Sequence, residues 1–132
     1  GLFDRKEWLD YSKKVNKILG EFRSWLLSRQ KESCTVFGYG AAAKASTLLN
    51  SINLEEGLIH AIADASQEKQ NRFMPPHGIA IISPDQLFVE KPTDVVIFPW
   101  NIKTEIAKFL SENLGSEVRM WCAIPEMHRV KN

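Results

Sequence analysis

Apolar side chains near the start of the chain recur at steps of three and four residues, which is the spacing of one face of an α-helix. Polar residues fill the other positions of this segment, residues 4–32. The pattern predicts one long amphipathic helix, with Gly20 as the candidate position for a break or kink. We expect its apolar stripe to be buried against the domain's own sheet, or else against a neighbouring domain or subunit. The stripe consists of Trp8, Tyr11, Val15, Ile18, Phe22, Trp25 and Leu26.

Short apolar runs alternate with helical stretches through the rest of the chain. Strands that alternate with helices in short units predict a parallel sheet with helices on both faces. The expected fold is α/β, a Rossmann-like three-layer sandwich with a mainly parallel five-stranded sheet in the order 3-2-1-4-5 and an N-terminal amphipathic helix. The expected strands lie at residues 34–37, 58–63, 78–82, 94–98 and 118–124, and the expected helices at 41–52, from 83 onward and at 102–114.

Helix-end signals support two of these helices. Ser83, Pro84 and Gln86 have the spacing of a cap, a first-turn proline and a capping box. Gly115 is the expected stop of the later helix. The residues expected on one face of that helix are Ile102, Ile106, Phe109 and Leu110.

The length of 132 residues allows one domain. We expect residues 1–33 to be a helical lead-in and residues 34–126 the α/β core, with a frayed tail or the stub of further chain from Met127. Because the first residue is Gly1 rather than Met, we expect a fragment of a longer chain or a chain with a processed start.

Composition narrows the function classes. The net charge is +1, from 17 Lys and Arg against 16 Asp and Glu, so the overall field is a poor match for nucleic acid. No apolar run is long enough for a membrane span and no secretory pattern is present, so we expect a cytoplasmic protein without a membrane partner. Cys34 and Cys122 are expected as small core side chains, with a disulfide possible but not required.

The most informative stretch is a glycine-rich turn after the first expected strand. Gly38, Gly40 and Ala43 match G-x-G-x-x-A, where the first glycine permits a tight turn, the second lets a phosphate approach the backbone and the alanine lets the helix pack closely. Asp64 closes the next strand, where a carboxylate can accept hydrogen bonds from a ribose. Lys44 falls in the first helical turn, where a bound phosphate would relieve its repulsion from the helix dipole. Equally, the small residues fit a tight turn without any ligand, and Lys44 can simply point into water.

A second candidate site follows the fourth expected strand. Trp100 and Asn101 lie where ligands bind in open α/β sheets, beyond the carboxyl ends of the strands. Trp100 could stack on a base or sugar, or only pack, and Asn101 could be only a helix cap. The loop after Asp64 carries Lys69, which can reach the same edge. The sequence contains no convincing catalytic base, Ser-His-Asp order, paired carboxylates or metal-ligand spacing.

Several ordered motifs together resemble a known family. Residues 38–44 (GYGAAAK) and 47–50 (TLLN) are similar to the hallmark of the C-terminal domain of sugar C-methyltransferases, which depend on S-adenosylmethionine (SAM) and act on nucleotide-linked deoxysugars. Asp64 with Lys69, residues 75–81, residues 99–101 (PWN) with 105–106, and residues 124–126 (IPE) match in the same order. The resemblance covers nearly the whole chain from Cys34.

The resemblance implies a substrate-binding domain that is not catalytic when isolated. SAM would bind an upstream methyltransferase domain that follows a zinc-binding module, so no cofactor or metal is expected here. The implied partners are a nucleotide-linked sugar and the upstream methyltransferase domain, and a homodimer is a further candidate. The implied substrate-side residues are Tyr39, Gly40, Ala41, Ala42, Lys44, Asp64, Lys69, Trp100 and Asn101.

Two other functions stay open at this point. The glycine turn and Asp64 also suit a stand-alone module that binds NAD or coenzyme A. The long N-terminal stripe and departures from the family pattern, such as Ala45-Ser46 and Pro75-Pro76, also suit a docking domain that binds no ligand.

Overall fold

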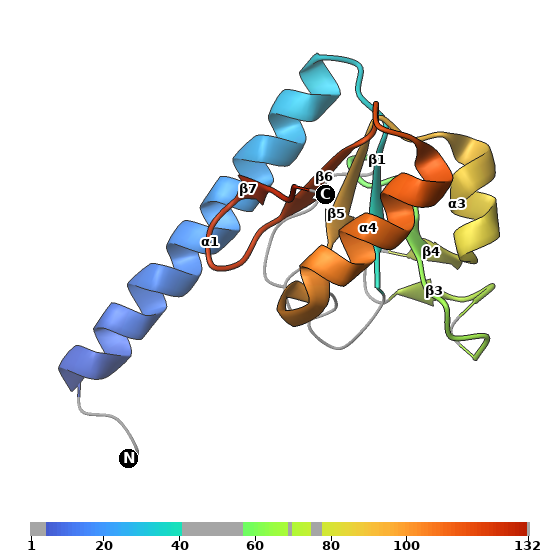
Figure 1. The fold of residues 1–132 in the computed structure, drawn as a ribbon. Helices are drawn as coiled ribbons and strands as arrows, with labels where there is room; N and C mark the ends of the chain where they lie inside the picture. The colour runs from blue at the N-terminus through green and yellow to red at the C-terminus, as the bar shows by residue number, and fades with distance from the viewer. Residues whose placement is uncertain (1–4, 41–56, 69, 75–77, 132) are drawn as a thin grey trace.

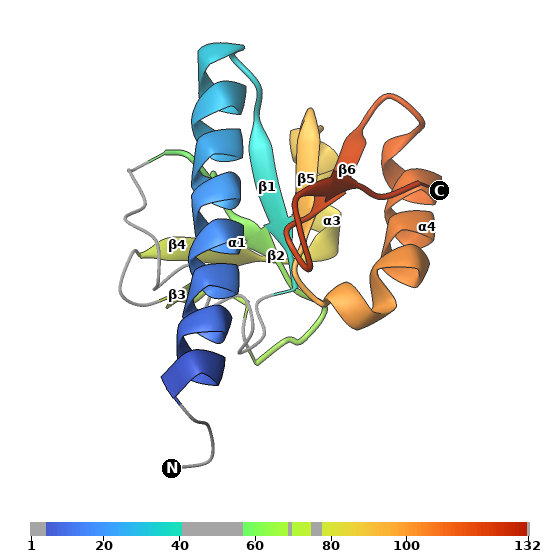
Figure 2. The same ribbon diagram turned by 90° about the vertical axis from the view of Figure 1, so that its left-hand side faces the viewer.

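The computed structural model describes residues 5–40, 57–68, 70–74 and 78–131. The expected helix at residues 41–52 lies outside these ranges. The described part is a seven-stranded sheet with helix α1 on one face and helices α3 and α4 on the other (Figures 1 and 2). The expected mixed α/β, three-layer architecture is confirmed.

Helix α1 spans Arg5–Lys31 as one uninterrupted helix of 27 residues. It runs through Gly20 without a break, because an added side chain there would meet nothing within 4 Å and packing forces no bend at this point. Glu7 in the first turn and basic residues in the last turn suit the helix dipole. Only its second half carries fully covered side chains, among them Phe22 and Leu26.

The central five strands are parallel and follow the predicted order. The sheet order is β3-β4-β2-β1-β5-β6-β7, and the parallel pairs join β4 to β2, β2 to β1, β1 to β5 and β5 to β6. These five correspond to the expected order 3-2-1-4-5, which is confirmed. Their bounds are Val36–Tyr39 for β1, Ile62–Ala63 for β2, Ile79–Ile82 for β4, Asp94–Ile97 for β5 and Arg119–Cys122 for β6.

Two short antiparallel strands extend the sheet at its edges. Strand β3 (Phe73–Met74) pairs with β4 inside a segment expected to be a loop, and β7 (His128–Arg129) pairs with β6 inside the expected frayed tail. The sheet therefore continues beyond residue 126, the expected limit of the core. Two-residue strands are too short to show the alternation by which a strand is recognised in a sequence.

The capped helix follows its sequence signals closely. In α3 (Pro84–Glu90), the Gln86 amide donates to Ser83 Oγ at 3.2 Å and the Ser83 amide donates to Gln86 Oε1 at 2.9 Å. The later helix begins differently from expectation: residues Trp100–Ile102 form a 3₁₀ helix, η1, and α4 spans Lys103–Leu114. Gly115 ends α4 with a φ of 90°, as predicted.

Each face of the sheet has its own apolar core. On one face, Phe22, Trp25 and Leu26 of α1 pack against Val36 and Val96. On the other face the buried helix residues are Leu87, Ala107 and Leu110, which pack with Phe37, Val95, Ile97 and Met120. Successive residues of β1 and β5 thus enter opposite cores, as a sheet covered on both sides requires.

The two cysteines differ in burial. Both thiols are free. Cys122 is a small buried side chain of the core under α4, as expected. Cys34 is only half-buried, because its Sγ lies at the sheet's amino-terminal edge, 3.4 Å from Nη2 of Arg119. Within the described ranges, no helix is long and apolar enough to cross a membrane.

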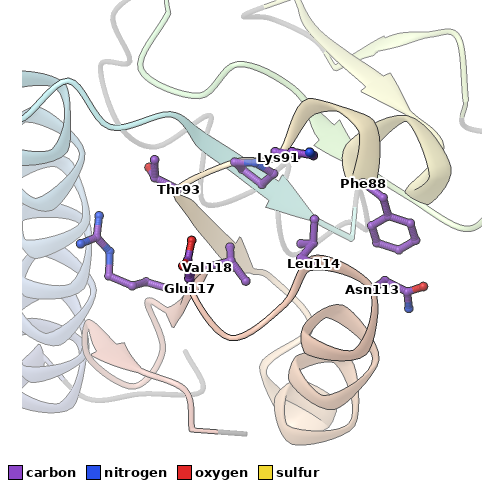
Figure 3. A pocket seen from close by; sticks show the side chains of 9 residues that line it. Phe88, Lys91, Thr93, Asn113, Leu114, Glu117 and Val118 are labelled. Carbon is purple, nitrogen blue, oxygen red and sulfur yellow. The ribbon is translucent and has the colours of Figure 1, made fainter.

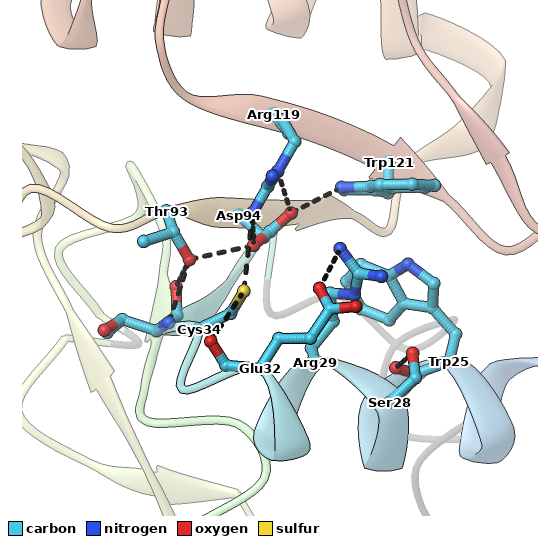
Figure 4. Close-up of polar contacts among 10 residues, drawn as sticks. Trp25, Ser28, Arg29, Glu32, Cys34, Thr93, Asp94, Arg119 and Trp121 are labelled. Carbon is cyan, nitrogen blue, oxygen red and sulfur yellow. Dashed lines mark hydrogen bonds and ion pairs between the residues drawn. The ribbon is translucent and has the colours of Figure 1, made fainter.

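A fully buried carboxylate, Asp94, begins strand β5 and accepts hydrogen bonds from two residues of β6 and from the residue before it, Thr93 (Figure 4). Arg119 donates through Nε to Oδ1 at 3.0 Å and through Nη2 to Oδ2 at 3.1 Å. Trp121 Nε1 donates to Oδ1 at 2.8 Å, and the Thr93 hydroxyl lies 2.8 Å from Oδ2. A buried charge is tolerated only when it is paired in this way.

The same network reaches helix α1 through Trp121. Its indole packs against Trp25, with ring centroids 5.0 Å apart. The guanidinium of Arg29 lies 5.8 Å from the Trp121 centroid and that of Arg129 lies 5.4 Å from it. Asp94 therefore fixes the tryptophan on which the second half of α1 rests.

Replacing Asp94 by Asn should lower the free energy of unfolding by about 3 kcal/mol, because Arg119 then loses its anionic partner. Urea denaturation of the two proteins measures this difference. Asp10→Asn on the exposed first half of α1 is the matched control and should change the value by less than about 0.5 kcal/mol. Equal losses in both variants would contradict the assigned role of Asp94.

Stability should also fall in acid for a reason specific to Asp94. Burial alone would raise the pKa of this carboxyl, but hydrogen bonds from Arg119, Thr93 and Trp121 and the charge of Arg119 outweigh burial and lower it below its usual 3.8. As the pH falls, Asp94 therefore takes up its proton earlier in the unfolded state than in the folded state. The stabilisation that the ionised Asp94 carboxylate gives the fold is complete at neutral pH, and it disappears as the pH falls below about 3.8 toward the folded-state pKa. Unfolding free energies measured from pH 7 to pH 3 should show the gap between the natural protein and Asp94→Asn closing in acid, and a constant gap would refute this explanation.

Candidate functional site

The carboxyl ends of the central strands meet at one edge of the sheet. Tyr39, the last residue of β1, pairs with Ala63 of β2 and Ile97 of β5. The residues that follow these three strands therefore lie next to each other at this edge. The predicted site residues that the structure brings there are Tyr39, Gly40, Asp64, Trp100 and Asn101. Of the other predicted site residues, Ala41, Ala42, Lys44 and Lys69 lie outside the described residues.

Gly38 has a different role from the tight turn that its motif predicts. It lies inside β1, where it pairs with Ile62 and Val96. A Cβ at this position would lie 2.7 Å from Cε2 of Phe98 and 3.0 Å from Cγ1 of Ile62. The glycine is therefore required because the neighbouring side chains cross the strand at this point.

Gly40 provides the turn instead. Its φ of +92° is a conformation that favours glycine, and its amide donates to the Ala63 carbonyl at 2.7 Å. A Cβ here would lie 2.6 Å from Cδ of Pro99. The close contact with Pro99, which follows β5, is thus sufficient to explain why this residue is glycine. The same contact joins the turn after β1 and the segment after β5, the two candidate segments, into one surface.

Asp64 organises the loop that leaves β2. Its amide donates to the Ile82 carbonyl at 2.9 Å, and its Oδ1 accepts a hydrogen bond from the Ser66 amide at 2.8 Å. Its carbonyl oxygen accepts one from Gln70 Nε2 at 2.8 Å. One carboxylate oxygen of Asp64, the residue predicted to bind a ribose, is therefore used to hold the loop. The carboxylate itself stays at the edge of the sheet.

Tyr39 places a phenol near that carboxylate. Burial raises the pKa of Tyr39, and the negative charge of Asp64 raises it further. The hydroxyl is consequently neutral at physiological pH and can both donate and accept a hydrogen bond. The Tyr39 ring also contacts Phe109 of α4, with centroids 6.3 Å apart.

The 3₁₀ helix η1 presents two large apolar side chains at the same edge. Trp100 is 43% exposed and Ile102 is 46% exposed. Hydrogen bonds from the Phe98 amide to the Tyr39 carbonyl (3.1 Å) and from the Trp100 amide to the Phe98 carbonyl (2.7 Å) tie this segment to β1. Asn101 lies within η1 and is exposed, and the cap position of α4 is Ile102, so Asn101 is not the cap of that helix.

The periodic pattern put Ile102 and Phe109 on the buried face of the later helix, but both are exposed, by 46% and 40%. Phe109 contacts Tyr39 and Phe88 with its ring and is otherwise open to solvent. Because η1 precedes α4, Ile102 is out of phase with that face and points to solvent. The signal that could have revealed this is Pro99, which leaves the next residues to make a tight turn before the α-helix starts.

Two hollows of the described surface lie away from this edge. One, of about 560 Å³, is at the amino ends of β5 and β6, with Lys91, Thr93, Asn113 and Glu117 among its lining residues (Figure 3). The other, of about 490 Å³, is lined mainly by Phe37, His60, Ala61, Ile82 and Val89. Neither includes Tyr39, Asp64 or Trp100. Among the described residues, no group of three or more His, Cys, Asp or Glu side chains could hold a metal ion.

Comparison with known proteins identifies the family. Residues 1–125 match the family described as the C-methyltransferase C-terminal domain. The chain belongs to this family. The predicted resemblance is thereby confirmed at the level of the C-methyltransferase C-terminal domain.

The chain is also similar to a curated protein, the C-methyltransferase NovU of Streptomyces niveus. The identity is 27% over 126 residues, which cover 96% of this chain and 30% of NovU. The chain thus spans about a third of the length of this relative.

A solved structure supports the fold. The crystal structure of UDP-D-quinovosamine 4-dehydrogenase from Vibrio fischeri superposes with a TM-score of 0.57 and 21% identity, covering 74% of this chain and 93% of that chain. At this identity the likeness confirms a Rossmann-type fold and carries no further conclusion.

The close contact between Gly40 and Pro99 predicts a specific loss of stability when Gly40 is replaced. Gly40→Ala should destabilise the domain by about 1–3 kcal/mol more than Gly57→Ala, because only Gly40 is in contact with another part of the chain. Gly57 is the matched control, since its φ is also positive (+86°) but a Cβ would meet nothing within 4 Å. Chemical denaturation of both variants measures the difference, and equal losses would show that Pro99 is not the constraint.

Proposed function

We propose that this domain binds the nucleotide-linked sugar that a C-methyltransferase modifies, and holds it at the carboxyl edge of β1, β2 and β5. The observation that carries the proposal is the meeting, at this edge, of a polar pair and an exposed indole in a chain of the C-methyltransferase C-terminal domain family. The edge lies between β1 and β5, where the strand order reverses, and ligands of open α/β sheets bind at this position.

Each described residue has a chemical role in this proposal. Trp100 offers an indole face on which a nucleobase or sugar ring can stack. Tyr39, neutral at physiological pH, can exchange hydrogen bonds with hydroxyl groups, and the Asp64 carboxylate can accept them from a ribose. Lys44 and Lys69 lie outside the described residues and stay candidates for pairing with the diphosphate by their charge.

The reaction itself requires groups beyond those named. Methyl transfer to carbon moves CH₃ from the sulfonium of SAM to a carbon atom, which must lose a proton to a base. We place SAM and this base in another part of the enzyme, so this domain would hold and orient the sugar without catalysing transfer alone. The length of NovU outside the match leaves room for such a part in that relative.

Thermal-shift measurements of the 132-residue chain with a TDP-sugar, NAD, coenzyme A and SAM test the proposal. A TDP-sugar at about 100 times its dissociation constant should add about 2.7 kcal/mol of stability, which raises the melting temperature by about 10 °C for a domain of this size. A response to SAM or NAD in place of the TDP-sugar would overturn the assignment.

Trp100→Ala should weaken binding of the TDP-sugar by about tenfold or more, because one stacking contact is worth about 1–3 kcal/mol. Titration calorimetry measures the affinity of each variant. The matched control is Phe73→Ala, which removes another exposed aromatic ring on the edge strand β3, separated from β1 by two strands. An equal effect of both variants would place the ligand elsewhere.

A further inference from the structure

The apolar stripe of helix α1 is continuous, but the domain covers only half of it. Its positions alternate by three and four residues along one face of the helix, and they are Trp8, Tyr11, Val15, Ile18, Phe22 and Trp25. In the second half, Phe22 is 0% exposed. In the first half, Trp8 and Tyr11 are each 56% exposed, and the adjacent Leu9 is 49% exposed.

The body of the domain ends beside the middle of the helix. Ile18 and Leu19 still pack against the core, and the Met127 amide lies 3.5 Å from Oε2 of Glu21. A helix of 27 residues is about 40 Å long. Its first half therefore extends past the sheet, as Figures 1 and 2 show from two directions.

The first half of α1, which we call the overhang, extends on the side of the domain that carries the candidate site. Helix α1 and strand β1 run in opposite directions, so the start of α1 lies toward the carboxyl end of β1 (Figure 1). The η1 segment with Trp100 follows β5 at that same end of the sheet. A partner that covers Trp8 and Tyr11 would consequently lie on the same side of the domain as the edge at which we place the sugar.

The exposed residues have the character of an interface. Trp and Tyr are the side chains that most often dominate the energetics of protein contacts. Here the two rings lie together, with centroids 6.1 Å apart. A helical segment of this length is marginal in water without tertiary packing, so the first half of α1 has a physical reason to be covered.

We propose that the surface formed by Trp8 and Tyr11 is the docking site for the SAM-binding part of the methyltransferase. The occupant follows from three observations: the family is a C-terminal domain, the match covers 30% of NovU, and the overhang extends on the side of the domain to which the carboxyl ends of β1 and β5 point. A partner docked on this surface would hold the methyl donor on the side at which we place the sugar. This inference rests on the proposed function, since it assigns the partner of the same site.

Hydrogen exchange tests the docking directly, in the methyltransferase polypeptide that carries this domain and in the 132-residue chain alone. Amides of residues 5–18 should exchange at least about tenfold more slowly in the polypeptide that includes the SAM-binding part. Equal exchange rates in the two proteins would overturn the proposal.

A double variant, Trp8→Glu with Tyr11→Glu, tests the consequence for catalysis. Methyl transfer should fall by about tenfold or more, because hot-spot residues lose their contact, and the exchange protection of residues 5–18 should disappear. The matched control is Lys6→Glu with Lys13→Glu, which changes exposed residues of the same half of α1 and should preserve both. Equal loss in the control pair would show that charge, not the apolar surface, is responsible.

Two further measurements distinguish a failure of the docking proposal from a failure of the proposed sugar binding. The response of the 132-residue chain to a TDP-sugar should be unchanged by the double variant, so a domain that binds no TDP-sugar refutes the proposed function while the exchange data still judge the docking. Light scattering reports the oligomeric state of the 132-residue chain. A dimer that the double variant abolishes would assign the surface to a second copy and overturn the proposal.

Discussion

The positions of strands β5 and β6 and of helix α1 depend on how one buried charge is satisfied. Asp94 has no exposed surface, and a carboxylate removed from water must be compensated by donors that converge on it. Arg119 and Trp121 supply those donors from β6, which fixes the neighbouring strand. Since Trp121 also supports Trp25, the same requirement determines where α1 crosses the sheet, and therefore which part of α1 extends beyond it.

The edges of the sheet at the amino ends and at the carboxyl ends of its strands are held by different interactions. At the amino edge, charge-assisted hydrogen bonds join Arg119 of β6 to Asp94 of β5, and a separate ion pair joins Arg29 to Glu32 at the end of α1. At the carboxyl edge the backbone of β1 comes into close contact with Pro99 through Gly40. Strands of four residues are only about 13 Å long, so the network at one edge positions the surface at the other with little freedom between them.

The parts of the fold that were predictable are those that repeat. The parallel order could be inferred because strands and helices alternate, and α3 could be placed because Ser83 and Gln86 have complementary roles at fixed spacing. Strand β7 was not predictable, because two residues are too few to show the alternation by which a strand is recognised. Ile102 was misplaced because a short 3₁₀ turn shifts the phase of the helix that follows it.

That the candidate residues after β1, β2 and β5 meet at one edge was predictable, but the structural reasons for the glycines were not. The G-x-G pattern drew attention to the turn after β1, yet Gly38 and Gly40 satisfy contacts with Phe98, Ile62 and Pro99 that no spacing rule contains. The Asp94 network left no pattern at all, since Asp94, Arg119 and Trp121 come together only through strand pairing. The overhang of α1 likewise depends on the length of the sheet beneath it.

Gly20 lies within the covered part of α1, between Leu19, which packs against the core, and Phe22, which is fully buried. A side chain added at Gly20 would meet nothing within 4 Å. Glycine weakens a helix interior by about 1 kcal/mol relative to alanine. Tertiary contacts on both sides of the glycine, rather than the intrinsic propensity of this turn, therefore keep α1 continuous here.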